Sequence, residues 1–208
     1  MRGDAIYSRY YQYALGPEYR RVEYLESSGA AYIDTGVASA LDISVYFRAQ
    51  LLSRSTLVSS GNEKQGGICV SHWQNPFSFA FNFGDTGYNP VRGVIPIDVQ
   101  EIYEIVLDKD MYSVNGQSTS NIASSISTSS HLHLFRDVWN LNPVDTKIYL
   151  AKIRKNGTPV RNLVPAVRVS DSKPGMYDLC GSICPLTNTP FYINGGNGDD
   201  FTWGELQS

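Results

Sequence analysis

The chain has 208 residues, a formal net charge of −3 and only 18% charged side chains. It contains no run of lysine or arginine that would hold a phosphate backbone, which argues against nucleic acid as a partner. No stretch approaches the ~20 apolar residues that span a bilayer, and the N-terminus lacks the basic and apolar regions of a signal peptide. We therefore expect one domain with a short appendage, no membrane insertion, and any release from a cell by a route such as lysis.

Residues 1–18 are predicted to form a short helical anchor, separate from the remainder of the chain, 19–208. Asp4 can cap the helix, and Gly16 followed by Pro17 ends it. A helix of about eleven residues is marginal in water, so its aromatic stripe must dock on the chain's own domain, a sister subunit or another protein. The stripe follows the spacing of one helix face and includes Ala14. Its larger residues supply the predicted oligomer or anchor interface: Tyr7, Tyr10, Tyr11 and Leu15.

From Tyr19 onward the apolar pattern has a period of two, which is typical of strands buried on one face. Asn115–Gly116 and Asn156–Gly157 are tight-turn sequences, and Ser118 to Ser130 is expected to be a loop. About seven or more short strands with turn signals predict an all-β sandwich or barrel. The alternation is clearest in Ile43–Leu51, Phe77–Phe83, Tyr103–Leu107, Tyr112–Val114, Leu132–Leu134 and Ile148–Leu150.

Several stretches have the form of a recurrent β domain. Val22–Gly29 followed by Tyr32–Gly36 has the form of an opening strand pair. Phe191–Gly196 has the form of a final hairpin. The form of closing strands is found in Lys147–Tyr149, Ile153–Gly157, Val160–Ala166 and Gly175–Asp178.

Taken in order from Tyr19 to Phe201, these stretches resemble the concanavalin A-like or laminin-G-like jelly-roll domains of phage structural proteins and bacterial surface proteins. The resemblance implies an all-β, two-sheet antiparallel jelly-roll sandwich. The chain departs from the family pattern at Cys180–Pro190, where a longer cysteine-bearing excursion replaces a tight turn. Such sandwiches include lectins, glycosidases and inert structural domains, so function has to be argued from sites.

Sandwich glycosidases need two carboxylates on one strand face, ~5 to 5.5 Å apart in retaining enzymes. The nearest approach is Asp98, Glu101 and Glu104, whose spacing of three places successive carboxylates on opposite faces of a strand. We interpret them as solvated charges and expect a protein that binds or assembles, with no catalytic residues.

His131 and His133 share one strand face and would hold a metal if a third ligand such as His72 or Asp137 joined them. Two outward polar side chains explain this pair without a metal. The run 195–200 offers oxygen ligands on a flexible backbone, which suits calcium, although a glycine-rich hairpin tip also explains it. Its candidate ligands are Asn197, Asp199 and Asp200, and no other cofactor is expected.

The cysteines are odd in number, so they cannot all pair within the chain. Cys180 and Cys184 are close enough in sequence for a local disulfide, and two free thiols explain them equally well. The tripeptide Arg2–Gly3–Asp4 matches an adhesion motif, but three-residue matches arise often by chance.

Sugar binding requires an exposed aromatic ring to stack on the pyranose and amides to bond its hydroxyls. Two segments have this composition, each with a tryptophan and amides beside a proline turn. Tryptophans that plug the ends of a sandwich explain the same pattern. The candidate glycan contacts are Trp73, Asn75, Tyr88, Trp139, Asn140 and Asn142.

The hypothesis that follows is a non-enzymatic virion protein, namely a tail-fibre, head-fibre or capsid-decoration component. Its sandwich projects while the helix mounts it in a homo-oligomer, most simply a trimer, with other virion proteins as partners and a host-surface glycan as a candidate ligand. The alternative is a secreted or surface-bound bacterial carbohydrate-binding module. A glycoside hydrolase of sandwich fold is the third hypothesis.

Overall fold

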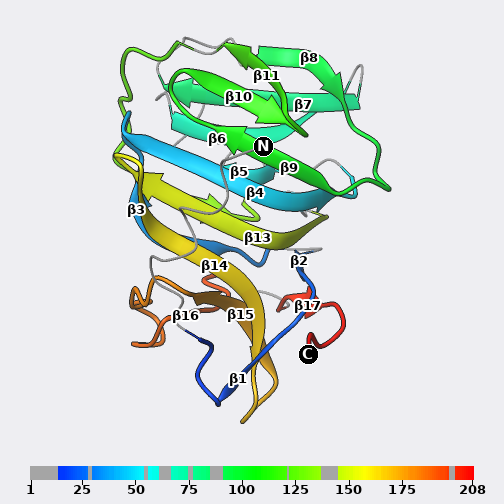
Figure 1. The fold of residues 1–208 in the computed structure, drawn as a ribbon, viewed down its shortest axis with the longest axis vertical. Helices are drawn as coiled ribbons and strands as arrows, with labels where there is room; N and C mark the ends of the chain where they lie inside the picture. Colours follow the sequence, from blue (N-terminus) through cyan, green and yellow to red (C-terminus); the bar gives the residue numbers. More distant parts are fainter. Residues whose placement is uncertain are drawn as a thin grey trace, which may run out of the picture.

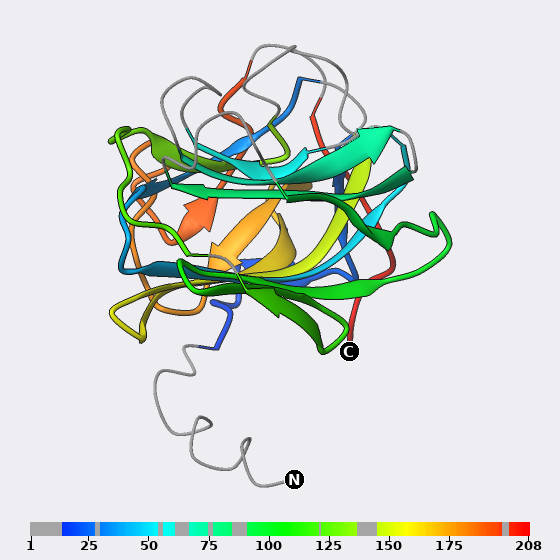
Figure 2. The same ribbon diagram turned by 90° about the horizontal axis from the view of Figure 1, so that it is seen from above.

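The computed structural model describes residues 14–27, 30–53, 56–60, 67–74, 77–84, 91–120, 122–136, 145–196 and 200–208, with the backbone alone for 72–74, 77 and 91–94. These residues form two antiparallel sheets that face each other, as Figures 1 and 2 show. The described part of the chain contains strands and turns without a helix. The predicted antiparallel all-β, two-sheet architecture is therefore confirmed.

The large sheet contains eleven strands. Strands β1 (Tyr19–Arg21) and β2 (Leu25–Ser27) join it beside β14 and β13, and β17 (Thr202–Trp203) pairs with β2. The main order is β11 (Gln117–Ser120), β10 (Met111–Val114), β9 (Tyr103–Leu107), β4 (Ile43–Leu51), β13 (Thr146–Lys155), β14 (Thr158–Arg168), β15 (Lys173–Asp178) and β16 (Phe191–Tyr192).

The small sheet contains six strands and covers one end of the large sheet (Figure 1). Its order is β3 (Ile33–Ala38), β12 (His131–Leu134), β5 (Thr56–Ser59), β6 (Gly67–Gln74), β7 (Phe77–Gly84) and β8 (Val91–Pro96).

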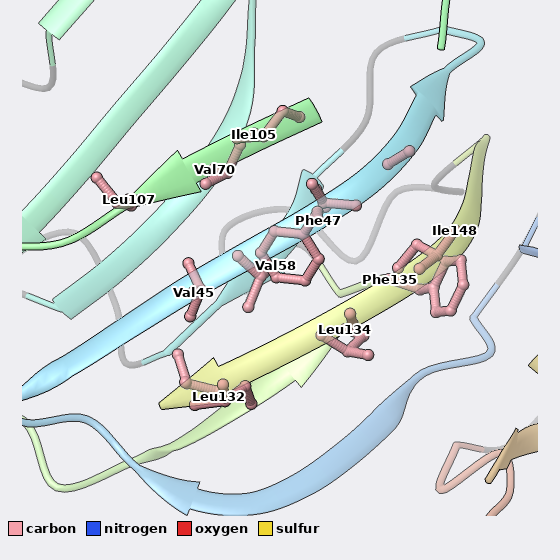
Figure 3. Packing of buried hydrophobic residues seen from close by; sticks show 14 of the residues in the cluster. Val45, Phe47, Val58, Val70, Ile105, Leu107, Leu132, Leu134, Phe135 and Ile148 are labelled. Carbon is pink, nitrogen blue, oxygen red and sulfur yellow. The ribbon is translucent and has the colours of Figure 1, made fainter. Parts of the chain in front are cut away.

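The main core lies between the two sheets because alternate residues of each strand point inward. In β4, Val45 and Phe47 are buried, while Arg48, at an outward position of the same strand, is exposed. Figure 3 shows Phe47 and Ile148 of the large sheet beside Val58 and Leu134 of the small sheet. The two-residue alternation expected from the sequence is thus confirmed in β4, and the same pattern recurs in β9.

The expected hairpin turns are also present. Asn115 and Gly116 have φ values of 48° and 79°, and Asn156 and Gly157 have values of 49° and 74°. Asparagine and glycine tolerate these left-handed conformations, which match the twist of two-residue hairpins. The expected loop Ser118 to Ser130 begins later than predicted, because β11 extends to Ser120 and pairs with β10.

Two parts of the resemblance are wrong in detail. The stretches expected as an opening strand pair do not pair with each other, because β2 lies in the large sheet and β3 in the small sheet. The expected final hairpin is absent from the described residues, since β16 pairs with β15 and the C-terminal strand β17 pairs with β2. Instead, β2, β3 and β17 pair with strands that are distant in the sequence, while β16 pairs with the strand just before it.

A second apolar cluster lies on the outer face of the large sheet. Val164 and Ala166 of β14 are buried there because they alternate with the core residue Leu163. Tyr19 covers them, with its ring centroid 5.0 Å from that of Tyr177 and 4.8 Å from that of Phe191. The start of the described chain therefore packs on the side of the large sheet that faces away from the small sheet (Figure 2).

The predicted N-terminal helix falls mostly on residues 1–13, including Tyr7, Tyr10 and Tyr11, which lie outside the described residues. Ala14, Leu15 and Gly16 are described and have no regular secondary structure. Leu15 is partly buried against the Tyr19 cluster of its own chain. Leu15, one of the predicted interface residues, thus packs at least in part on the sandwich of its own chain.

Candidate binding site on the outer face of the small sheet

A polar cluster lies where β3 and β12 pair at the edge of the small sheet. We call it the Asp34 cluster, and it consists of Tyr32, Asp34, His131, His133 and Arg136. Ile33, Leu132 and Leu134 alternate with these residues and are fully buried, so the cluster faces outward from the core. The outer face of the small sheet therefore presents a carboxylate, two imidazoles and a guanidinium at one place.

A backbone irregularity brings both histidines to one carboxylate. His133 pairs with Asp34 in register, whereas His131 pairs with Ala38, so β3 has extra residues between the two pairs. Gly36 lies in this irregular stretch with a φ of 66°, and its amide donates to Asp34 Oδ1 at 2.8 Å. A bulge of this kind re-aims side chains along a strand. Here it places two strand positions of β12 against the same side chain.

Asp34 is the centre of the cluster. Its Oδ1 lies 3.0 Å from Nδ1 of His131, and its Oδ2 lies 3.8 Å from Nε2 of His133. The Asp34 side chain is 41% exposed and that of His131 is 47% exposed, while His133 is only 17% exposed. Nδ1 of His133 is buried without a hydrogen-bond partner. Asp34 and His131 are thus accessible to a ligand, and His133 supports them from below.

The ionisation of the cluster follows from these contacts. Burial alone would raise the pKa of the Asp34 carboxyl, but the Gly36 amide and the histidines outweigh it and lower the pKa below its ordinary value. Burial lowers the pKa of His133, Asp34 opposes this shift, and Arg136 and His131 add to it. Asp34 is therefore ionised across the physiological range, and His133 is neutral near pH 7.

Tyr32 holds the edge of the cluster in place. Its ring meets the His133 ring edge-on at a centroid distance of 5.2 Å, and the guanidinium of Arg136 lies over it at 4.5 Å. Its backbone amide donates to Asn194 Oδ1 at 3.1 Å, and its carbonyl accepts from the Gly195 amide at 2.9 Å. The segment after β16 is thereby fastened to the start of β3.

The segment after β12 folds back over the outer face of the small sheet. Phe135 has a φ of 61° and is buried in the core, where it contacts Phe201 with centroids 5.0 Å apart. The next carbonyl, of Arg136, accepts a hydrogen bond of 2.6 Å from Ser59 Oγ. Ser59 follows the core residue Val58 and therefore lies on the outer face of the small sheet, yet it is fully buried. The turn at Phe135 thus delivers Arg136 to the cluster.

A metal site is not formed by these residues. Within the described part of the chain, no three His, Cys, Asp or Glu side chains are arranged to hold a metal ion. His72, proposed as a third ligand, pairs in register with the core-facing position of Phe79, and Asp137 lies outside the described residues. The two histidines share Asp34 instead, a partner that the sequence analysis missed because it lies on a distant strand.

Of the three predicted calcium ligands, Asp200 alone belongs to the described residues. Asp200 forms an ion pair with Lys173, and its Oδ1 accepts from the Phe201 amide at 3.0 Å. A carboxylate engaged in this way is a poor calcium ligand, because the lysine already neutralises it. Asn197 and Asp199 lie outside the described residues.

The predicted glycan contacts fall mainly outside the described residues, which applies to Asn75, Tyr88, Trp139, Asn140 and Asn142. Trp73 is described by its backbone alone and pairs in register with Ser78 of β7. Ser78 alternates with the core residue Phe79, so this pair belongs to the outer positions of the small sheet. The structure thus places one of the predicted positions on the same sheet face as the Asp34 cluster.

The three carboxylates considered for glycoside hydrolysis do not share a strand face. Asp98 and Glu101 belong to the turn before β9, where the Glu101 amide donates to the Asp98 carbonyl at 3.1 Å. Glu104 is exposed on β9 and interacts with the hydroxyl of Tyr46 on the neighbouring strand. Arg2–Gly3–Asp4 lies outside the described residues.

Cys69, Cys180 and Cys184 carry free thiols. Burial, with Asp178 nearby, raises the pKa of Cys180 to about 11. Of the two alternatives left open by the sequence, the structure has the pair as thiols.

No protein-family model matches this chain, and no curated protein matches its sequence. Among the described residues, no helix is long and apolar enough to cross a membrane.

Proposed function

We propose that this chain is a non-enzymatic virion structural protein, a tail-fibre, head-fibre or capsid-decoration component with a concanavalin A-like jelly-roll sandwich. One outer face of the sandwich mounts the protein and the other is displayed. The N-terminal segment, with its tyrosine stripe on a helix, is the mounting element. Its partners are sister subunits, most simply in a trimer, and other virion proteins, and the ligand of the displayed face is a cell-surface glycan.

One observation supports this proposal: the first described residues and the Asp34 cluster lie on opposite sides of the sandwich. Leu15 and Tyr19 pack on the outer face of the large sheet, so the described chain begins on that side. The Asp34 cluster lies on the outer face of the small sheet. The outer faces of a two-layer sandwich point in opposite directions, so a mounting segment on one leaves the other free.

The test is light scattering on the full chain and on a chain that begins at Ala14. This truncation keeps Leu15 and Tyr19, so the second apolar cluster stays covered. We expect an oligomer for the full chain and a monomer after truncation. A matched control is Ile122→Ser, which changes an apolar side chain that is 82% exposed elsewhere and should leave the oligomer intact. The same number of subunits in the full and truncated chains would refute a homo-oligomer held together by the N-terminal segment.

A bacterial secreted or surface carbohydrate-binding module is the alternative, and the accessible Asp34 cluster favours it equally. A monomeric full chain that binds glycans would select this alternative. A glycoside hydrolase remains the third hypothesis, and hydrolysis of a polysaccharide that is lost in Glu101→Gln or Glu104→Gln would select it.

A further inference from the structure

The ring of Tyr32 is not a platform for a neutral sugar. A Cβ atom added at Gly195 would lie 3.2 Å from Cε2 of Tyr32, and one added at Gly196 would lie 3.3 Å from Cδ1, so the glycine backbone runs close against the ring. Arg136 lies over the ring and His133 meets its edge. A pyranose would have to displace one of these groups in order to stack. Recognition here must therefore use charge and hydrogen bonds.

The donors of the cluster are cationic or become so. Arg136 is always charged and presents a planar fork that matches a carboxylate. Stacking on Tyr32 restricts its orientation, which reduces the entropy lost when it binds a ligand. His131 of β12 is half exposed, and its Nδ1 is directed to Asp34, so Nε2 is the nitrogen that remains for a ligand.

We infer that the Asp34 cluster binds the carboxylate of an acidic sugar residue, of the uronic or sialic acid type. Arg136 and His131 contact the carboxylate, and Asp34 accepts hydrogen bonds from neighbouring sugar hydroxyls. This inference rests on the proposed display of the outer face to glycans and assigns the ligand class and the site. The contacts are reversible, with no covalent step.

The charge of the cluster makes binding depend on pH. Near pH 7 the charges of Asp34 and Arg136 cancel, because the buried His133 is neutral. As the pH falls towards the lowered pKa of His133, protonation of that imidazole makes the cluster positive, while Asp34 stays ionised because its own pKa is also lowered. The neighbouring charged groups on the packed elements, Arg161 and Asp178, form their own pair and do not change this sign. Acidic sugars should thus bind more tightly at lower pH.

The experiment is a titration of the full chain with glucuronate and with N-acetylneuraminate, followed by the imidazole NMR signals of His131 and His133. Glucose and acetate are the comparison ligands, and each titration is done at pH 7.5 and 5.5. We expect binding of the acidic sugars to be tighter at pH 5.5 by on the order of tenfold, with glucose and acetate weaker.

Arg136→Gln should weaken acidic-sugar binding by about tenfold or more, since it removes a charge-assisted hydrogen bond. His131→Gln should weaken it as well, because it removes the half-exposed imidazole that contacts the ligand. Arg20→Gln, which removes an exposed arginine of β1 on the large sheet, is the matched control and should bind normally. Melting curves establish whether each variant is folded. If Arg136→Gln does not fold, His131→Gln provides the test.

The outcomes separate this inference from the proposed function. Unchanged acidic-sugar binding in both cluster variants would overturn the site, while leaving glycan display intact. Equal binding of acetate or of glucose would overturn the ligand class. An absence of sugar binding, with an oligomer still lost on truncation, would overturn the inference and leave the virion mounting role standing.

Discussion

Arg161 of β14 and Asp178 of β15 form a buried ion pair, with 3.8 Å between Nε and Oδ2. Asp178 is fully buried, and its Oδ1 accepts hydrogen bonds from the amides of Asn162 and Cys180 at 2.8 and 2.9 Å. The same Nε of Arg161 donates to the Thr35 carbonyl of β3 at 2.8 Å. The pair therefore ties an end of the large sheet to the edge strand of the small sheet.

Asp178→Ala should destabilise the fold by about 3–5 kcal/mol, because it leaves the arginine charge without its partner and two amides without an acceptor. Asp110→Ala is the control, since Asp110 pairs with Lys109 at the exposed β9–β10 turn and should cost less than about 1 kcal/mol. Urea unfolding of both variants gives the comparison. Similar midpoints for the two variants would contradict the role given to the buried pair.

Tyr19→Ala should destabilise the protein by about 3 kcal/mol, because Tyr19 is 7% exposed and covers the apolar outer face of β14, β15 and β16. The same substitution at Tyr46, a partly exposed ring on β4, is the control and should have a smaller effect. Thermal unfolding measures both. Equal effects at the two positions would mean that Tyr19 does not cover the cluster.

Gly196→Ala should disturb the fastening of Tyr32, since the added Cβ would lie 2.5 Å from the Ala30 carbonyl oxygen, a backbone atom that cannot move aside alone. We expect a loss of about 1–3 kcal/mol, measured by chemical unfolding. At Gly16 an added Cβ would meet only the flexible end of the Glu18 side chain, so Gly16→Ala is the matched control. A stable Gly196→Ala variant would show that the close approach to the ring is dispensable.

The depressed pKa of His133 predicts a loss of stability in acid. Burial disfavours its charged form in the folded state, so below the ordinary histidine value of about 6.5 the unfolded chain binds more protons than the folded one. Stability should therefore fall as the pH drops from about 6.5 towards the lower pKa of folded His133. His133→Gln should flatten this dependence in unfolding curves at pH 7.5 and 5.5. If the stability of the variant falls with pH as steeply as that of the original chain, groups other than His133 cause the pH dependence.

The raised pKa of Cys180 predicts a slow thiol. Because the thiolate is the nucleophile, alkylation by iodoacetamide at pH 8 should be far slower in the folded chain than in the unfolded chain, and should accelerate up to pH about 11. Cys180→Ser identifies the signal. Fast alkylation at pH 8, or an intact mass lower by the two hydrogens of a disulfide, would run against this prediction.

The alternation of apolar residues was enough to predict the strands and the all-β class, because a period of two specifies which residues of a strand are buried. Ile43 to Leu51 is the clearest example, and β4 has these bounds. The turns at Asn115–Gly116 and Asn156–Gly157 were predictable for a local reason, since few residues tolerate a positive φ. Such features depend on neighbours in the chain.

Tertiary structure alone decided what lies beside what. The sequence placed His131 and His133 on one strand face, but Asp34 is 97 residues away from His131 and joined them only through the pairing of β3 with β12. Arg136 reached the cluster only through the turn at Phe135. The pairing of distant strands depends on the summed burial of both sheets, and no local pattern records that sum.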